Sequence, residues 1–375
     1  MIKIVVIGGG FAGISALERF SKKFQHLDIT LIDKKSKFDF LPLLPDLIGA
    51  KVSPSGLSFD LANFCQKAGI RFVNSEISRI DLVNKAVSFD SRSLSYDYLL
   101  IASGTHTNFY DNQTVEKISF KLESIQDALK IQDGLERGCF ENFIVAGGGY
   151  TGIEVATNIK RYCRKQKIEK PIVIVEKSPS ILGALPEWMR QYAHVNLKSL
   201  GIEIFLNDSI SQVSGSSIRF SSGRIFENSM LIWVAGVVGE KYIHGSGLEN
   251  NLQGRLKADY FLRVFEGCFV AGDAGCFPVK GNCLRMAVQF SIVQGRLAAE
   301  NILHSIKGEG LVKYRPLDFG YVIPMIDSKA CGFALGLPVR GIFAISLHYL
   351  MCFYLSKGLA NKIRLLRDLL KGGVR

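Results

Sequence analysis

Ile4-Val5-Val6-Ile7-Gly8-Gly9-Gly10-Phe11-Ala12-Gly13 and Phe143-Ile144-Val145-Ala146-Gly147-Gly148-Gly149-Tyr150-Thr151-Gly152 share one design. In each, an apolar run that predicts a strand leads into three glycines, and a helical pattern follows. The first glycine permits a tight turn, the second leaves room for a phosphate beside the backbone, and the third lets the helix pack closely on the strand. The helix N-terminus then attracts an anion. The two turns therefore predict two dinucleotide sites.

An acidic residue ends the apolar strand that follows each turn. Asp33 lies 20 residues after Gly13, and Glu176 lies 24 residues after Gly152. A carboxylate at this place can accept hydrogen bonds from the ribose hydroxyls of a dinucleotide. A single glycine fingerprint is a weak signal, but two copies in the strand–turn–helix context, each with its acid, favour nucleotide binding over ordinary turns.

A third turn reads Cys268-Phe269-Val270-Ala271-Gly272-Asp273. Its small and apolar residues predict a buried strand end, where Asp273 can bond a ribityl hydroxyl of a flavin. The predicted strand 98–102 also runs into a small-residue turn, Ser103-Gly104-Thr105, that suits close approach of a ligand. Together the three turns indicate two different dinucleotides in one chain, as in a flavoprotein supplied by a nicotinamide cofactor.

The order of these motifs predicts an α/β protein with two Rossmann-like dinucleotide-binding domains. The NAD domain, residues 109–236, is inserted between the two parts of an FAD domain, residues 1–108 and 237–315. Residues 316–375 form a separate C-terminal region. Shorter predicted elements are the strands 70–73 and 86–89 and the helices 124–137 and 286–305.

The C-terminal region predicts two membrane-associated helices. The apolar run 342–355 is too short to span a bilayer, which needs roughly 20 apolar residues. After Gly358 an amphipathic pattern places apolar residues on one helical face and basic residues on another. The apolar set is Leu359, Ile363, Leu366 and Leu370, and the basic set is Arg364, Arg367, Lys371 and Arg375. Such a helix suits insertion into an anionic membrane surface, although packing into a core or dimer is the structural alternative.

The amino-acid composition limits the classes of partner that we expect for this chain. The net charge of +12 and the pI of about 9.2 suit nucleic acid or an anionic membrane, and the chain has no nucleic-acid motif, so we expect a membrane. The eight cysteines show no CxxC and no zinc spacing, which predicts no metal site and reduced thiols in a cytosolic compartment. The N-terminus shows no secretory signal.

The sequence resembles the type II NADH dehydrogenases, single-subunit and non-pumping NADH:quinone oxidoreductases, nearly from end to end. Besides the three turns, the likeness includes Phe38 to Gly49 (FDFLPLLPDLIG), Trp233 to Val237 (WVAGV), Leu256 to Val264 and the basic amphipathic ending. The two-dinucleotide part is shared by all relatives of this fold, whereas the ending is more specific.

The resemblance implies FAD in the first domain, NADH in the second and a lipid quinone as electron acceptor. It assigns to FAD the residues Gly8, Gly10, Phe11, Ala12, Gly13, Asp33, Ile77, Ser103, Gly104 and Asp273. It assigns to NADH the residues Gly147, Gly149, Gly152, Glu176 and Gly236. It places Glu154 near the flavin, with Lys329 near that glutamate. Glu154 is the expected proton relay, and His348 is a weaker candidate.

One segment departs from the family. The quinone-side helix of the family carries AQxAxQ, and the first glutamine is kept as Gln289. Val293 stands where the second is expected, and Gln294 comes one position late. One residue turns a helical side chain by about 100°. The departure leaves the quinone contact open.

The expected activity is hydride transfer from NADH to FAD, followed by transfer of two electrons to a membrane quinone. We expect a peripheral protein at the cytoplasmic face of the cell membrane. A homodimer is one expectation for its oligomeric state. Three alternatives stay open. A sulfide:quinone oxidoreductase needs a cysteine pair, for which Cys163 or Cys139 with Cys331 are available. The others are a soluble NAD(P)H-dependent reductase of an electron-carrier protein and a slow redox sensor.

Overall fold

The computed structural model describes residues 1–21 and 26–372, and contacts between Cα atoms divide the chain into two compact units. Unit 1 comprises residues 1–38, 59–106 and 237–318, and unit 2 comprises residues 39–58, 107–236 and the chain from residue 319 onward. Arg375, which the sequence placed in the basic stripe, lies outside the described residues.

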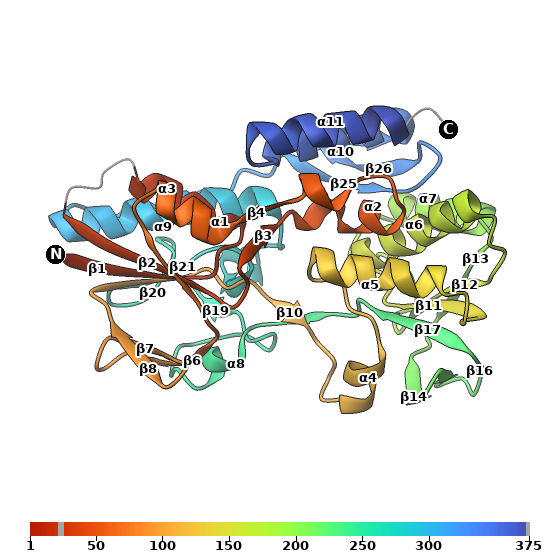
Figure 1. Ribbon diagram of the computed structural model, residues 1–375, viewed down its shortest axis with the longest axis horizontal. Coiled ribbons are helices and arrows are strands. Elements are labelled where there is room, and N and C mark those ends of the chain that lie inside the picture. The colour runs from red at the N-terminus through yellow and green to blue at the C-terminus, as the bar shows by residue number, and fades with distance from the viewer. Residues whose placement is uncertain (22–25, 373–375) are drawn as a thin grey trace. The chain divides into compact units, whose positions relative to one another are not determined.

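Unit 1 is built on a six-stranded sheet (Figure 1). Its central strands are parallel, and only the edge strand β20 runs antiparallel. In hydrogen-bonding order the strands are β20 (Arg263–Phe265), β21 (Cys268–Val270), β9 (Tyr98–Ile101), β1 (Ile2–Ile7), β2 (Leu27–Asp33) and β5 (Arg71–Asn74). The chain leaves β1 toward β2 on one side and meets β9 on the other, so the first glycine turn lies at the switch point where open α/β sheets bind ligands.

Two helices cover this sheet near the turn. The predicted helix after the turn is α1 (Phe11–Phe20), and α9 (Val288–Lys307) packs along it. A Cβ atom on Gly295 of α9 would lie 2.1 Å from the carbonyl oxygen of Ala12, so glycine permits the close approach of the two helices. The prediction of a helix over 286–305 is confirmed.

The smaller elements of unit 1 surround this core. The antiparallel sheet β6–β7–β8 contains the predicted strand 86–89 as β7. The remaining elements are α3 (Leu61–Lys67), β6 (Ile77–Asp81), β7 (Ala86–Phe89), β8 (Arg92–Ser95), α8 (Lys241–His244), β19 (Leu256–Lys257), η4 (Gly272–Ala274), β22 (Gly275–Cys276), β23 (Pro278–Val279) and β24 (Asn282–Cys283).

Unit 2 contains a second parallel sheet, β13–β12–β11–β17, with the second glycine turn after β11. Its strands are β11 (Asn142–Ala146), β12 (Ile172–Glu176), β13 (Ile202–Leu206) and β17 (Ser229–Trp233), and its helices include α6 (Tyr150–Gln166) and α7 (Glu187–Ser199). The strand–turn–helix–strand prediction is confirmed for both turns, because β-branched runs and glycine turns are local signals.

Residues 39–58 group with unit 2 and not with the first domain, where the sequence placed them. The reason is packing: α2 (Leu44–Ile48) contacts both α5 (Ile125–Glu136) and α6. The predicted helix 124–137 is α5, whose N-cap side chain Ser124 accepts from the backbone N–H of Asp127. The shorter elements of this unit are η2 (Leu41–Leu43), η3 (Pro54–Gly56), α4 (Gln113–Ile118), β14 (Ile210–Ser214), β15 (Ser217–Phe220) and β16 (Ile225–Phe226).

Four short strands lie along the chain at the boundaries between the units. They are β3 (Lys37–Asp39), β4 (Ser58–Asp60), β10 (His106–Thr107) and β18 (Val237–Val238).

The C-terminal part of unit 2 is a small antiparallel sheet followed by two helices. The sheet consists of β25 (Gly320–Pro324), β26 (Ala330–Ala334) and β27 (Leu337–Arg340). Helix α10 (Gly341–Leu355) packs Ala344 and Ile345 into its core, and α11 (Leu359–Gly372) follows (Figure 1). Within residues 1–21 and 26–372, no helix has the length and apolar character needed to cross a bilayer.

Candidate dinucleotide sites

The first glycine turn is shaped by backbone contacts that only glycine allows. Gly8 has φ +97°, and a Cβ atom there would lie 2.4 Å from the carbonyl oxygen of Ala102. A Cβ atom on Gly13 would lie 1.8 Å from the carbonyl oxygen of Gly8. A Cβ atom on Gly10 would meet no atom within 4 Å. Gly8 and Gly13 are therefore required by the fold, whereas the space above Gly10 is open for a ligand.

Asp33 lies beside this turn at the end of β2. Its carboxylate accepts hydrogen bonds from the backbone N–H of Gly9 at 2.5 Å and of Lys35 at 2.7 Å. Burial raises the pKa of Asp33, although these hydrogen bonds act in the opposite direction. The acid is held rigidly at the mouth of the turn, where the ribose of a dinucleotide would lie.

A small cleft opens next to Asp33, and three buried hydroxyls line it. Ile77 and Ser103, both assigned to FAD, line it together with Ser75 and Tyr242. The Ser75 hydroxyl is buried without a hydrogen-bond partner in the described part of the chain, and the Ser103 and Tyr242 hydroxyls are buried beside each other. Unpartnered buried hydroxyls cost free energy. The open space above Gly10 and these hydroxyls fit the adenosine and pyrophosphate of FAD.

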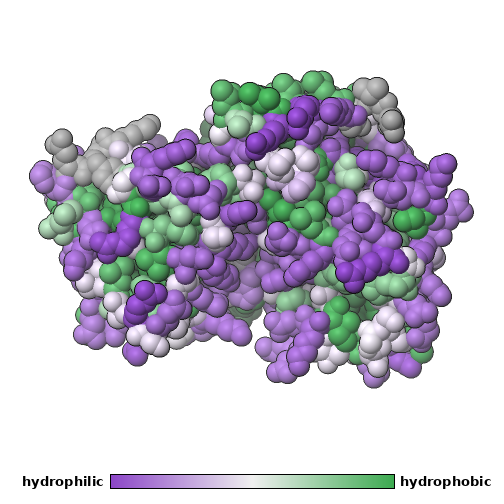
Figure 2. Space-filling view, in the orientation of Figure 1, coloured by the Kyte–Doolittle hydropathy of each residue, from purple (hydrophilic) through white to green (hydrophobic). Residues whose placement is uncertain are grey.

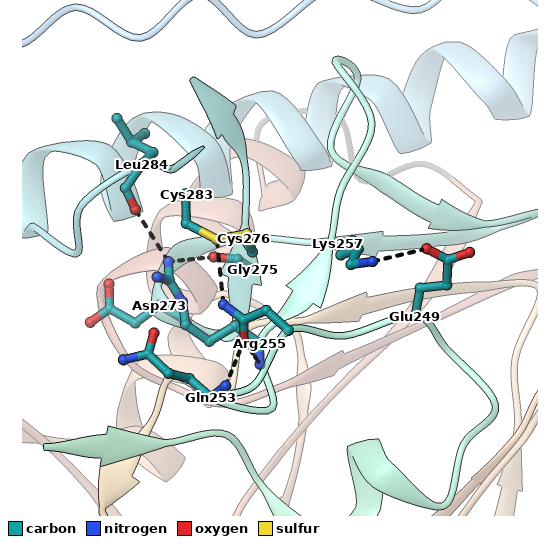
Figure 3. Close-up of a disulfide and its surroundings, with 10 residues drawn as sticks. Glu249, Gln253, Arg255, Lys257, Asp273, Gly275, Cys276, Cys283 and Leu284 are labelled. Carbon is teal, nitrogen blue, oxygen red and sulfur yellow. Dashed lines mark hydrogen bonds and ion pairs between the residues drawn. A yellow bond between two sulfur atoms is a disulfide. The ribbon is translucent and has the colours of Figure 1, made fainter. Parts of the chain in front are cut away.

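Asp273 lies at the third turn, in η4, where a second small cleft contains Ser291 and Gln294. The buried Arg255 side chain donates to the backbone carbonyl oxygens of Asp273 and Gly275, at 2.9 and 2.6 Å (Figure 3). Burial raises the pKa of Asp273, while the Arg255 charge acts to lower it. Arg255 thus fixes the turn that carries the ribityl-binding candidate, a role that no sequence motif revealed.

A disulfide lies next to this turn. Cys276, at the end of β22, is bonded to Cys283, at the end of β24, and the Arg255 side chain also donates to the carbonyl oxygen of Leu284, the residue after Cys283 (Figure 3). The expectation of reduced cysteines is therefore wrong for this pair. The β23–β24 hairpin folds the chain back between the two cysteines, which lie seven positions apart, a proximity that CxxC spacing does not test.

The second glycine turn repeats the first in unit 2. Gly147 has φ +111°, and a Cβ atom on Gly152 would lie 1.8 Å from the carbonyl oxygen of Gly147. A Cβ atom on Gly149 would again meet open space. Gly236, with φ +90°, faces the hydroxyl of Tyr110, which a Cβ atom would approach to 2.4 Å. The same geometry at both turns supports a second dinucleotide site.

Glu176 lies beside the second turn as Asp33 lies beside the first. Its carboxylate accepts from the backbone N–H groups of Gly148 at 2.6 Å and Ser178 at 2.7 Å. A carboxylate held there accepts from two ribose hydroxyls and repels a 2′-phosphate.

We expect a preference of at least a hundredfold in kcat/KM for NADH over NADPH, because opposing like charges at this site costs several kcal/mol. Glu176→Gln should lower the ratio of kcat/KM for NADH to kcat/KM for NADPH, because it raises kcat/KM for NADPH. The preference is measured by steady-state kinetics with both nucleotides. Equal kcat/KM values in the unsubstituted protein would contradict the assignment of Glu176.

The resemblance places Lys329 near Glu154, and the structure gives each residue its own contacts. Glu154 lies just after the first turn of α6, and burial, with the nearby Asp46 carboxylate, raises its pKa well above the usual range. Lys329 lies in the turn before β26, where its Nζ donates to Ser199 Oγ at 3.2 Å. The charge that acts on Glu154 is therefore the Asp46 carboxylate, which the sequence analysis did not single out.

The two glutamines of α9 have different roles. Gln289 donates to Asp318 at 3.1 Å. Gln294 is buried and accepts from the backbone N–H of Gly272 at 2.8 Å, so it supports the third turn. Val293, at the position of the family's second glutamine, is 46% exposed. The one-residue shift thus moves the glutamine from the helix surface to the interior.

The sequence of the chain matches one family over most of its length. The match to the family described as pyridine nucleotide-disulphide oxidoreductase covers residues 2–295. The chain belongs to this family. As a pyridine nucleotide-disulphide oxidoreductase it has relatives named type II NADH:quinone oxidoreductase in Staphylococcus saprophyticus and Staphylococcus aureus. Both are 24% identical, over 90% of this chain and 91% of theirs.

Solved structures of other proteins share the fold. NDH2 from Plasmodium falciparum in complex with NADH has a TM-score of 0.89 at 18% identity, covering 100% of this chain and 98% of that one. The sulfide:quinone oxidoreductase of Aquifex aeolicus has a TM-score of 0.80 at 19% identity, covering 94% and 90%. At these identities the likeness concerns the fold.

Proposed function

We propose that this chain is a peripheral membrane flavoenzyme that oxidises NADH and reduces a lipid quinone. The observation that carries the proposal is the repeated site: each unit has an open glycine turn with an acid held at its mouth. One such site serves FAD and the other NADH. Relatives named type II NADH:quinone oxidoreductase, aligned over 90% of the chain, support quinone as the acceptor.

In this proposal unit 1 holds FAD through its glycine turn, Asp33 and Asp273, and unit 2 holds NADH through its glycine turn and Glu176. When bound, FAD supplies the two-electron chemistry that connects NADH oxidation to quinone reduction. The protein contributes binding, orientation and protons. The predicted domain roles of residues 1–108, 109–236 and 237–315 are part of this proposal.

The membrane part of the proposal rests on α10 and α11. Exposed apolar side chains, green in Figure 2, lie over these helices beside basic ones, in purple. The exposed apolar set is Ile342, Phe343, Leu350, Tyr354, Leu359, Ile363, Leu366 and Leu370. Apolar side chains flanked by Lys and Arg suit the interface of an anionic bilayer. We place this face in the cytoplasmic surface of the cell membrane.

The alternative of a sulfide:quinone oxidoreductase requires a reactive cysteine pair. Cys139, Cys163 and Cys331 are free thiols, and no disulfide joins any two of them. Burial raises the pKa of Cys163 to about 11 and of Cys331 to about 12, which keeps both as unreactive thiols. NADH:quinone activity is the better supported function.

The function is tested with purified protein reconstituted with FAD. Anaerobic addition of NADH should bleach the flavin absorbance, and a membrane quinone in vesicles should restore it. Sulfide should leave the flavin oxidised. Bleaching by sulfide but not by NADH would overturn the proposal in favour of the alternative.

Glu154→Gln is expected to retain FAD and its reduction by NADH but to slow quinone reduction by about tenfold or more, within the range of general acid catalysis. Burial and the Asp46 charge raise the pKa of Glu154 and so favour its protonated form, whereas glutamine has no such proton to release. Stopped-flow measurement of the two half-reactions separates these effects. Unchanged rates in both would make Glu154 a structural residue.

A further inference from the structure

A buried carboxylate lies under helix α10. Asp46, in α2, is 2% exposed. Its Oδ1 accepts from the Tyr349 hydroxyl at 2.7 Å and lies 3.4 Å from Nη1 of Arg161. The Lys51 Nζ lies 3.6 Å from the centroid of the Tyr349 ring. A buried carboxylate is costly unless it is paired and hydrogen-bonded, so three elements contribute charge or hydrogen bonds around Asp46.

Helix α10 has two different sides. Its inner side carries His348, Tyr349 and the buried Cys352, whose Sγ lies 3.6 Å from Nε2 of His348. Its outer side carries exposed apolar residues, including Phe343 and Leu350. The face that we assign to the membrane therefore has an ionisable cluster directly behind it in the same unit.

The ionisable groups around Asp46 come from three parts of unit 2. They are Lys51 from the loop after α2, Glu154 and Arg161 from α6, and His348, Tyr349 and Cys352 from α10.

The negative charge of Asp46 raises the pKa of its titrating neighbours, which are Lys51, Glu154, His348, Tyr349 and Cys352. Burial lowers the pKa of Lys51 to about 8 and lowers that of His348, while the Asp46 charge raises both. Burial and the Asp46 charge together raise the pKa of Glu154. Burial thus moves the pKa values of Lys51 and Glu154 toward neutral pH from opposite sides, and neutral pH is the range in which a proton donor is most effective. His348 is neutral there and can accept a proton on one nitrogen while donating from the other.

We propose that Asp46 and the residues around it, Lys51, His348 and Glu154, form a proton reservoir for quinone reduction, with Asp46 as the positioning residue that keeps the protons in place. The proposal rests on the NADH:quinone activity proposed above. The overall reaction is NADH + H⁺ + quinone → NAD⁺ + quinol. NADH supplies two electrons and one hydrogen nucleus as hydride, and the reservoir supplies the other proton and regains it from water.

Asp46→Asn is the primary test, because it keeps the shape of the side chain and removes its charge. Every neighbouring group should then lose its proton at lower pH. We expect kcat with quinone near pH 8 to fall about tenfold and to recover as the pH is lowered, a small effect for acid–base catalysis. Reduction of ferricyanide, which accepts electrons without protons, should change by less than about twofold, since no proton transfer is needed.

A direct titration provides a readout that does not depend on turnover. Infrared spectroscopy detects the protonated carboxyl of Glu154, assigned as the band that Glu154→Gln removes. In Asp46→Asn this band should disappear at a lower pH than in the unsubstituted protein. A band with the same pH dependence in both proteins would overturn the proposal.

The matched control is Asp368→Asn in α11. Asp368 also binds the C-terminal helices to the rest of unit 2, accepting from the Ser53 N–H at 2.8 Å and hydroxyl at 2.6 Å. It is not among the groups that act on Glu154. The same shift in the pH profile for both variants, or equal losses with quinone and ferricyanide in Asp46→Asn, would show a structural role and overturn the proposal.

Tyr349→Phe is the second variant in case Asp46→Asn does not fold. It removes the hydroxyl that donates to Asp46 and keeps the ring beneath Lys51. Because the ionised form of Asp46 loses this hydrogen bond, it is less stable, and the pH profile of kcat with quinone should shift in the same direction as in Asp46→Asn. An unchanged profile would count against the reservoir. An unsubstituted protein that reduces ferricyanide with NADH but never a quinone would instead refute the proposed function.

Discussion

Gly149→Val is expected to weaken NADH binding about a hundredfold while the melting temperature stays the same. Gly149 has φ −78°, which valine adopts without strain, and its Cβ would meet no protein atom within 4 Å. The added side chain therefore occupies only the space where the pyrophosphate should lie. Forcing an extra group into a packed contact costs typically 1–3 kcal/mol, and a hundredfold loss corresponds to about 2.7 kcal/mol.

The control is Gly152→Ala, three residues along. Its Cβ would lie 1.8 Å from the carbonyl oxygen of Gly147, so the start of α6 must move and the melting temperature should fall. Isothermal titration with NADH and thermal unfolding measure the two effects. FAD content should stay constant in Gly149→Val, because the first glycine turn belongs to unit 1. If Gly149→Val binds NADH normally, no dinucleotide lies on this turn.

The sequence was sufficient for the features that depend on neighbouring residues. The strand before each glycine turn, the helix after it and the acid after the next strand all arise from local periodicity and turn chemistry. The C-terminal helices were predicted for the same reason: Leu359, Ile363, Leu366 and Leu370 repeat at helical spacing, and all four are exposed.

Contacts between distant segments could not be predicted in this way. Asp46 stands alone in an apolar segment, which was a visible signal, but its partner Tyr349 lies 303 residues away. The pairing of Cys276 with Cys283 depends on how the chain turns back through the β23–β24 hairpin, and the place of Lys329 beside Ser199 depends on how β26 packs on α7. Each of these depends on tertiary packing, which a motif does not encode.

Replacing Leu359, Ile363, Leu366 and Leu370 together by serine is expected to release the protein from anionic vesicles. These side chains are 76%, 59%, 47% and 65% exposed, so the fold does not depend on them. Inserting each into the bilayer contributes at least about 1.5 kcal/mol, or roughly 6 kcal/mol for four. The basic stripe contributes only about 1 kcal/mol per residue near the surface. The apolar face should therefore dominate binding, with a loss of well over a hundredfold.

Deleting residues 341–375 would be a poorer experiment. The deletion also removes Ala344 and Ile345 from the core of the small sheet and Tyr349 from the buried Asp46. The four serines instead leave the anchors of α11 in place, the buried Leu365 and the contact of Asp368 with Ser53.

Co-sedimentation with vesicles at low and high salt measures the effect, and Arg367→Gln with Lys371→Gln is the matched control. The control should weaken binding mainly at low salt, because salt screens exposed charges but not apolar burial. The serine variant should lose activity with a long-tailed quinone and keep it with ferricyanide, since both dinucleotide turns are unchanged. If the unsubstituted protein stays in the supernatant at low salt, α11 serves protein contacts, and a soluble reductase becomes the better interpretation.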